Sequence, residues 1–373
     1  MSDDITVGVV GGSGATGKVV VAELWKSTRW KIQIGGRSLD QAKTLASEFD
    51  QRVSAARLDV LDGSSLDKFC SRCSLVLNCA GPVSVLQDRV AQSAFRNRCH
   101  YVDPAGMSFV KERMLPHDRE IVDLGLSFVV SAGWIPGISE LLPVYAHARA
   151  SATMDSIESV TTYYGDSGEW SINALRDMVA FLRRAGLRRP RYFSKGEPVH
   201  ARARQASPKI DLGGRIGLRR FSLYSMPELD AVGRRLKTCN FFTYAYLPSP
   251  RIALTAALVA SLPLPKELSV RLLQNGFRSV LLPVGGFVTV QVRGRSHGQS
   301  QLLTVQIVYD KHRDYWIHGL TLATVARMVA NREGVQPGVN FLTEAIDPTA
   351  LMAELQNAGI EHTERLETCD SSA

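Results

Sequence analysis

The first 130 residues of the chain alternate short apolar runs, rich in β-branched residues, with longer stretches whose apolar positions recur at helical spacing. Short buried strands separated by amphipathic helices are typical of a parallel, doubly wound α/β sheet with helices on both faces. The expected strands are residues 5–10, 31–35, 53–58, 74–79, 99–103 and 126–131, and the expected helices are residues 15–27, 39–49, 64–70, 86–97 and 108–122.

The pattern changes after about residue 150. Runs such as Ile157–Tyr164, Val288–Arg293 and Leu302–Tyr309 alternate apolar with polar or small residues, which indicates a sheet covered on one face. A chain of 373 residues is also longer than the size at which proteins usually divide into domains with separate hydrophobic cores. We therefore predict a nucleotide domain over residues 1–150, a second α/β (α+β) substrate domain over 151–318, and C-terminal helices over 319–373. These helices, with a loop at 334–340, pack back on the first domain, and residues 364–373 fray.

A glycine-rich turn connects the first expected strand to the first expected helix. Its sequence, Gly12-Ser13-Gly14-Ala15-Thr16-Gly17, fits the G-x-G-x-x-G pattern of the Rossmann dinucleotide-binding fold. Gly12 permits the tight turn, Gly14 lets the backbone approach a pyrophosphate, and Gly17 lets the helix pack closely on the strand. N–H groups of the first helical turn would then face the phosphates. Glycine turns are common, so a structural turn is the alternative.

The end of the second expected strand indicates which dinucleotide is bound. An NAD site usually has an acidic residue about 20 residues beyond the glycine turn, but here the chain has Arg37 and Ser38, with no carboxylate until Asp40. A guanidinium group is a planar fork that suits a phosphate and can stack on adenine. Arg37 and Ser38 therefore favour NADPH. A solvated arginine after a strand is the alternative.

Other strand ends supply further cofactor contacts, because ligands of doubly wound sheets bind beyond the carboxyl ends of the strands. Asp59 can accept the adenine amino group. The small turn that contains Asn78, Ala80, Gly81 and Pro82 should pass beside the ribose and nicotinamide.

Candidates for a proton donor follow the fifth expected strand. Tyr101 and Asp103 lie on one side of that strand and His100 on the other, because strand side chains alternate. Tyr101 is the leading acid and His100 the second, and either residue can instead be structural. Asp103 can orient a donor or cap the next helix. Trp134 can wall the substrate pocket or fill the core.

The distribution of charge and of apolar runs excludes some classes of protein. The net charge of +8 comes from one segment, residues 183–220, which has twelve Lys or Arg against two acids. It lacks the interleaved aromatics and motifs of nucleic-acid binding, so a solvated arm or a docking face for an acidic protein or phosphorylated substrate remains. No apolar run reaches membrane-spanning length, and the N-terminus leaves no room for a targeting peptide, so we expect a cytoplasmic protein.

No metal site is expected. The six cysteines include one C-x-x-C pair, Cys70 and Cys73, without the second pair that a structural zinc needs, so reduced thiols are the default. Three histidines, His297, His312 and His318, show no metal-ligand spacing.

Together, five turns resemble those of the saccharopine dehydrogenase-like reductases in order and separation. They are Gly12–Gly17, Gly36–Ser38, Asn78–Pro82, Tyr101–Asp103 and Ala132–Gly137, and the resemblance is specific over residues 1 to about 145. It implies a Rossmann domain with an inserted substrate domain, and reduction of C=N bonds with NADPH. It also implies that the cofactor residues named above hold NADPH.

The length and the basic segment look most similar to the thiazolinyl imine reductases of pyochelin-type siderophore biosynthesis, which belongs to nonribosomal peptide synthesis. That similarity implies reduction of a thiazoline to a thiazolidine while the substrate is tethered to an acidic peptidyl carrier protein. A homodimer is a further expectation.

Two other functions stay open. An opine-type or saccharopine-type amino-acid dehydrogenase would need arginines in its cleft, for which Arg176, Arg271 or Arg278 could serve. A non-catalytic NADPH-binding sensor or scaffold is the other, because the sequence offers no convincing catalytic acid.

Overall fold

The computed structural model describes residues 5–166, 170–185, 190–237, 239–246, 250–278, 282–310 and 313–369. The chain forms two compact units, each made from two stretches of sequence. The nucleotide unit comprises residues 1–138 and 315–359, and the second unit comprises residues 139–314 and 360–373.

The described part of the nucleotide unit contains a seven-stranded parallel sheet with the strand order β15-β6-β5-β4-β1-β2-β3. The order reverses at β1, whose neighbours are β2 and β4, so the sheet is doubly wound as expected. Both faces of its central strands are buried, which requires helices on both sides. The strands are β1 (Thr6–Val10), β2 (Lys31–Gly36), β3 (Val53–Arg57), β4 (Leu75–Asn78), β5 (His100–Val102), β6 (Ser127–Val130) and β15 (Gly338–Phe341).

The helices of this unit follow the sequence pattern closely, with two breaks. The stretch 86–97 is divided at Gln87, which has a φ of 52°. The stretch 108–122 is divided by a 3₁₀ turn, Leu115–His117, because Pro116 cannot continue the preceding helix. The helices are α1 (Ala15–Ser27), α2 (Leu39–Ala46), α3 (Gly63–Cys70), α4 (Val83–Leu86), α5 (Arg89–Arg96), α6 (Met107–Met114), α7 (Asp118–Asp123), α14 (Asp314–Asn331), α15 (Leu342–Ala345) and α16 (Pro348–Asn357).

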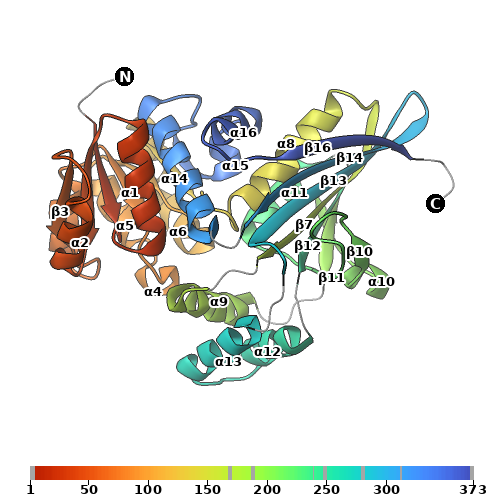
Figure 1. Cartoon of the computed structure of the whole chain (residues 1–373), viewed down its shortest axis with the longest axis horizontal. Helices are drawn as coiled ribbons and strands as arrows, with labels where there is room; N and C mark the ends of the chain where they lie inside the picture. Colours follow the sequence, from red (N-terminus) through yellow and green to blue (C-terminus); the bar gives the residue numbers. More distant parts are fainter. Residues whose placement is uncertain are drawn as a thin grey trace. The chain divides into compact units, whose positions relative to one another are not determined.

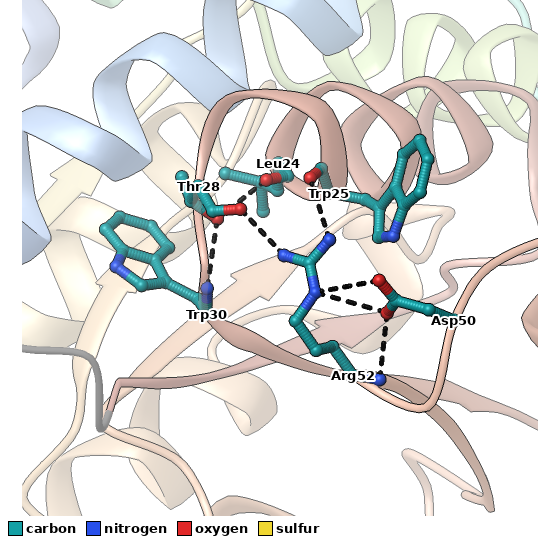
Figure 2. A network of polar contacts seen from close by, with 6 residues as sticks. All are labelled: Leu24, Trp25, Thr28, Trp30, Asp50 and Arg52. Carbon is teal, nitrogen blue, oxygen red and sulfur yellow. Dashed lines mark hydrogen bonds and ion pairs between the residues drawn. The ribbon is translucent and has the colours of Figure 1, made fainter.

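The C-terminal end of α1 is held by a polar network around Arg52 (Figure 2). The guanidinium donates to the carbonyl oxygen of Thr28 at 2.7 Å and to that of Trp25 at 3.3 Å. Its Nε also contacts both carboxylate oxygens of Asp50 at 3.1 Å. A helix end leaves carbonyls without intrahelical partners and carries partial negative charge, so this cation satisfies both needs. Arg52 therefore anchors α1 to the chain just before β3.

The second unit contains a mixed nine-stranded sheet in the described residues. Its main path is β10-β11-β12-β7-β13-β14-β16, and β8 joins it by pairing with β12 and with β9. Among the strand pairs of the described residues, β12 and β7 run parallel and the others are antiparallel. Buried and part-exposed residues alternate along β14, which fits the expected sheet with one covered face. The strands are β7 (Ser156–Asp166), β8 (Arg191–Ser194), β9 (Glu197–His200), β10 (Lys209–Asp211), β11 (Leu218–Leu223), β12 (Asn240–Tyr246), β13 (Gly286–Ser296), β14 (Gln299–Tyr309) and β16 (Thr363–Cys369).

Three helices of this unit, α9, α12 and α13, pack together around a small apolar cluster that includes Leu175, Val179, Val259 and Leu273 (Figure 1). The helices of the unit are α8 (Ile138–Ser151), α9 (Ile172–Ala185), α10 (Ala203–Ala206), α11 (Pro227–Arg235), α12 (Pro250–Ser261) and α13 (Lys266–Arg278). None of the helices in the described ranges is long and apolar enough to cross a membrane.

The C-terminal region differs from the expected helices in two places. The expected loop at 334–340 contains the start of β15, which pairs with β6. The expected frayed end contains β16, which pairs with β14 from Ser300 to Gln306. Both strands depend on partners far away in the sequence, so local pattern does not reveal them. The unit boundaries fall at 138/139 and 314/315, where the sequence suggested 150 and 318. A third boundary at 359/360 returns the end of the chain to the second unit.

Candidate functional site

The glycine turn is tightly packed and leaves the first turn of α1 open to an anion. A Cβ on Gly17 would lie 2.5 Å from the carbonyl oxygen of Gly11 and 2.6 Å from Cα of Gly12. Gly14 is the N-cap residue, makes no side-chain cap hydrogen bond, and is followed by no acidic residue in the first turn. N–H groups of this helical end therefore lack a side-chain partner, which is the arrangement that binds phosphate. Ser13, Ala15 and Thr16 complete the turn.

The end of β2 lies beside this turn. A Cβ on Gly36 would come within 3.5 Å of the Ser13 hydroxyl oxygen. Arg37 follows directly and is exposed, and among the described residues it forms no ion pair. The Ser38 hydroxyl accepts the N–H of Gln41 at 3.3 Å and caps α2. Arg37 is therefore available to a phosphate, whereas the Ser38 side chain already has a structural partner.

Asp59 follows β3 and is exposed. Its carboxylate accepts the N–H of Leu61 at 3.0 Å, which shapes the turn but leaves oxygen lone pairs for another donor. Asp59 also lines an open cleft of about 830 Å³ along the edge strand of the sheet. The cleft is lined by residues of β2, β3, α2, α3 and adjoining turns, among them Gln33, Lys43, Arg57, Asp62, Lys68 and Arg72.

The turn after β4 touches the glycine turn. A Cβ on Gly11 would lie 2.9 Å from the backbone nitrogen and Cα of Ala80. The Asn78 side-chain carbonyl accepts the Ala80 N–H at 3.1 Å, and the peptide bond between Gly81 and Pro82 is cis. The structure thus places Asn78, Ala80, Gly81 and Pro82 beside the loop that the sequence assigned to the pyrophosphate.

Asp103 ties two turns together at the carboxyl edge of the sheet. Its buried carboxylate accepts backbone N–H groups of Ala105, Gly106 and Ser131. Burial raises the pKa of Asp103 to about 6, although these three donors and the Tyr101 hydroxyl favour the charged form. Asp103 therefore caps the turn before α6 and joins it to the turn that follows β6.

Tyr101 belongs to the same buried network. It is fully buried, stacks on Phe128 with ring centroids 5.6 Å apart, and accepts a hydrogen bond from the Asn78 amide at 3.3 Å. Burial raises the pKa of Tyr101 well above its usual value. This placement links Tyr101 to the turn that begins at Asn78, but it offers no route by which Tyr101 itself could protonate a bound substrate.

His100 lies at the other edge of the sheet. It is the first residue of β5, so it lies at the amino ends of the parallel strands, away from the glycine turn. Its Nδ1 accepts the N–H of Ser127 at 3.0 Å, and burial lowers its pKa to about 4. The structure therefore does not support His100 as an acid at the cofactor, because one three-residue strand separates it from the carboxyl edge.

Trp134 and His318 meet at the turn after β6. Trp134 is fully buried, and its backbone N–H donates to Nδ1 of His318 at 3.4 Å. No local pattern connects these two residues, since they lie 184 residues apart. The histidine is brought to this turn by α14, which follows residues 139–314 of the second unit in the chain.

The basic segment of the second unit is not simply a free arm. Arg183 contacts Ser269, Arg191 pairs with Asp230, and Arg215 pairs with Asp310 at 2.7 Å. Eight cations in the described part of this segment are exposed: Arg183, Arg184, Lys195, Arg202, Arg204, Lys209, Arg215 and Arg220. Residues 186–189 lie outside the described residues.

The arginines proposed for a substrate cleft and the possible metal ligands differ in their exposure and contacts. Arg176 pairs with Glu267 at 3.1 Å, and Arg271 is exposed. The Arg278 side chain and His312 lie outside the part of the chain that can be described. Across the described ranges, no group of three or more His, Cys, Asp or Glu could hold a metal ion. All six cysteines are free, and burial raises the pKa of Cys70 to about 11.

The nucleotide unit is similar in sequence to domains of known proteins. Residues 7–129 match the family model described as the saccharopine dehydrogenase NADP binding domain. A probable mitochondrial saccharopine dehydrogenase-like oxidoreductase of Arabidopsis thaliana is 27% identical over 250 residues, covering 60% of this chain and 53% of the relative. A human saccharopine dehydrogenase-like oxidoreductase is 23% identical over 211 residues, covering 51% of this chain and 49% of the relative. The chain thus spans about half the length of the curated relatives it matches.

The fold has a close counterpart among solved structures. Apo saccharopine dehydrogenase (L-Glu forming) from Saccharomyces cerevisiae superposes with a TM-score of 0.66 at 17% identity, over 97% of this chain and 100% of that one. At this identity the likeness shows the shared α/β fold. Residues 7–129 thus match the saccharopine dehydrogenase NADP-binding domain, and the unit that contains them binds NADP(H).

Proposed function

We propose that this chain is an NADP(H)-dependent oxidoreductase that acts on a carbon–nitrogen bond. The observation that carries this proposal is the open N-terminus of α1 beside Arg37, which forms no ion pair among the described residues. Both lie within a stretch that matches an NADP-binding domain. The open helix end suits the pyrophosphate, and a guanidinium at the end of β2 suits the 2′-phosphate. Bound NADPH supplies a hydride to an electrophilic carbon.

The protein's own part in the reaction is placement. Gly11 and Ala80 hold the glycine turn and the turn after β4 in contact. Tyr101 fixes the turn after β4 through Asn78, and Asp103 fixes the turns after β5 and β6 through three backbone N–H groups. A rigid carboxyl edge of this kind keeps the cofactor in one orientation relative to its substrate.

An amino-acid dehydrogenase of the saccharopine type is the first substrate class to test. The named function of the yeast structural counterpart is the dehydrogenation of saccharopine with formation of L-glutamate. Such substrates carry carboxylates, and the exposed Arg271 is a side chain that can bind one.

A carrier-linked thiazoline, reduced to a thiazolidine as in siderophore biosynthesis, is the second class. It is favoured by the exposed Lys195, Arg202, Arg204, Lys209 and Arg220, which can attract an acidic carrier protein. It predicts that carrier attachment raises turnover and that added salt removes the gain.

The decisive experiment follows NADPH absorbance with two substrate panels. One pairs amino acids with keto acids, and the other contains cyclic imines, free and carrier-linked. Oxidation of NADPH with either panel supports the proposal and chooses between the classes. Tight NADPH binding without oxidation of NADPH in any mixture would contradict it and favour a non-catalytic NADPH-binding sensor.

A further inference from the structure

His318 lies where two parts of the nucleotide unit converge. It is in the second turn of α14, and its neighbour Gly319 packs directly on α1: a Cβ there would lie 2.5 Å from Cβ of Val19 and 3.1 Å from the carbonyl oxygen of Thr16. Figure 1 shows α14 beside α1 within this unit. The helix that carries His318 is therefore fixed against the first turn of the helix that faces the pyrophosphate.

The imidazole ring also contacts the carboxyl edge of the sheet. Nδ1 accepts the N–H of Trp134 at 3.4 Å, and a Cβ on Gly133 would lie 3.3 Å from the same nitrogen. Gly133 is in the turn after β6, and its Cα lies so close to Pro104 that a Cβ would be 2.5 Å from the Pro104 carbonyl oxygen. His318 thus lies against the turns that follow β5 and β6.

This location is on the nicotinamide side of the expected cofactor. A dinucleotide crosses the switch point of a doubly wound sheet, which here is at β1, with the adenosine over β2 and β3. Arg37, at the end of β2, marks that adenosine side. The other half of a bound cofactor would extend from the α1 N-terminus over the ends of β4, β5 and β6.

The hydrogen bond at Nδ1 determines what the ring can offer. A nitrogen that accepts a backbone N–H carries no proton, so the proton of the neutral ring is on Nε2. Burial lowers the pKa of His318 to about 4, which keeps the ring neutral at physiological pH. The side chain is partly exposed, and Nε2 has no hydrogen-bond partner among the described residues. It is a fixed donor on the far side of the ring from Trp134.

We propose that His318 is a positioning residue of the nicotinamide subsite, whose Nε2–H donates a hydrogen bond to the nicotinamide half of NADP(H). It acts as a neutral donor to the carboxamide oxygen of the nicotinamide ring. The inference deepens the proposed function but depends only on cofactor binding, so its test needs no substrate.

Two ligands separate this role from a structural one. NADP⁺ contains the nicotinamide half, and 2′-phospho-ADP-ribose lacks the nicotinamide ring. Their dissociation constants are measured by calorimetry for the full chain. His318→Asn keeps a short side-chain oxygen for the Trp134 N–H but removes the distal donor, whereas His318→Gln places an amide N–H near the position of Nε2.

His318→Asn should weaken NADP⁺ binding by about 3- to 10-fold, the usual effect of one lost hydrogen bond, and leave 2′-phospho-ADP-ribose binding unchanged. His318→Gln should restore much of the NADP⁺ affinity. Equal weakening of both ligands, or no change in NADP⁺ affinity, would overturn the proposal. If His318→Asn does not fold, His318→Ala gives the same comparison. Absence of turnover with every substrate would refute the oxidoreductase assignment and leave this result standing.

Discussion

Replacing Arg52 with alanine should destabilise the nucleotide unit by about 2 kcal/mol. The substitution removes two charge-assisted hydrogen bonds to the carbonyls of Trp25 and Thr28 at the end of α1, each worth about 1 kcal/mol net. The Asp50 carboxylate is exposed, so loss of that ion pair adds little. For a domain of about 150–250 residues this corresponds to a fall in Tm of about 4–8 °C.

The assay is thermal and urea unfolding of the full chain, followed by tryptophan fluorescence, with Trp25 and Trp30 next to the perturbed site. Arg57→Ala is the matched control, because Arg57 is an exposed arginine at the far end of β3 without an ion pair among the described residues. It should change stability by less than about 0.5 kcal/mol. Arg52→Lys should fall between the two, since it keeps the charge but not the planar fork. Equal stability of Arg52→Ala and Arg57→Ala would refute the assignment of Arg52 as the anchor of α1.

Three other outcomes are expected. Arg37→Asp should shift the ratio of NADPH to NADH affinity towards NADH in fluorescence titrations, because a carboxylate repels the 2′-phosphate; an unchanged ratio would show that Arg37 does not contact it. Gly17→Ala should weaken NADPH binding and lower Tm, since its Cβ would be 2.5 Å from backbone, whereas Gly63→Ala, with nothing within 4 Å, should do neither. Burial lowers the pKa of His100 from 6.5 to about 4, so between these pH values the unfolded chain binds more protons than the folded chain. The free energy of unfolding is therefore highest above pH 6.5 and decreases as the pH falls towards 4. His100→Asn should lose less unfolding free energy than the wild type between pH 7 and pH 5.

The nucleotide unit could be predicted well because its signals are local. Strands such as Thr6–Val10 are continuous apolar runs, and the glycines that follow have the spacing of a phosphate-binding turn. The positions of Gly12, Gly14, Gly17, Arg37 and Asn78 follow from where those strands end.

The candidates for the proton donor could not be ranked from the sequence. Their access to a bound cofactor depends on burial and on the length of β5, which the local pattern does not reveal. Alternation along the strand correctly placed Tyr101 and Asp103 on one side, and the Tyr101 hydroxyl does lie at the Asp103 carboxylate. It did not show that Tyr101 is fully buried or that His100 lies at the opposite edge. His318 could not be predicted as a site residue from the sequence, because only tertiary packing brings α14 to the turn after β6.

The two-part construction of the nucleotide unit has a consequence for the order in which the protein can mature. During synthesis, residues 1–138 leave the ribosome well before β15 and α14, which belong to the same unit. Until residue 341 has emerged, the backbone of β6 has an unpaired edge, and the surface of α1 at Thr16 and Val19 lacks its covering helix. The intervening residues 139–314 can begin to fold first, although their sheet gains β16 only from the last residues of the chain. The nucleotide unit becomes complete only after α14 and β15 have been synthesised.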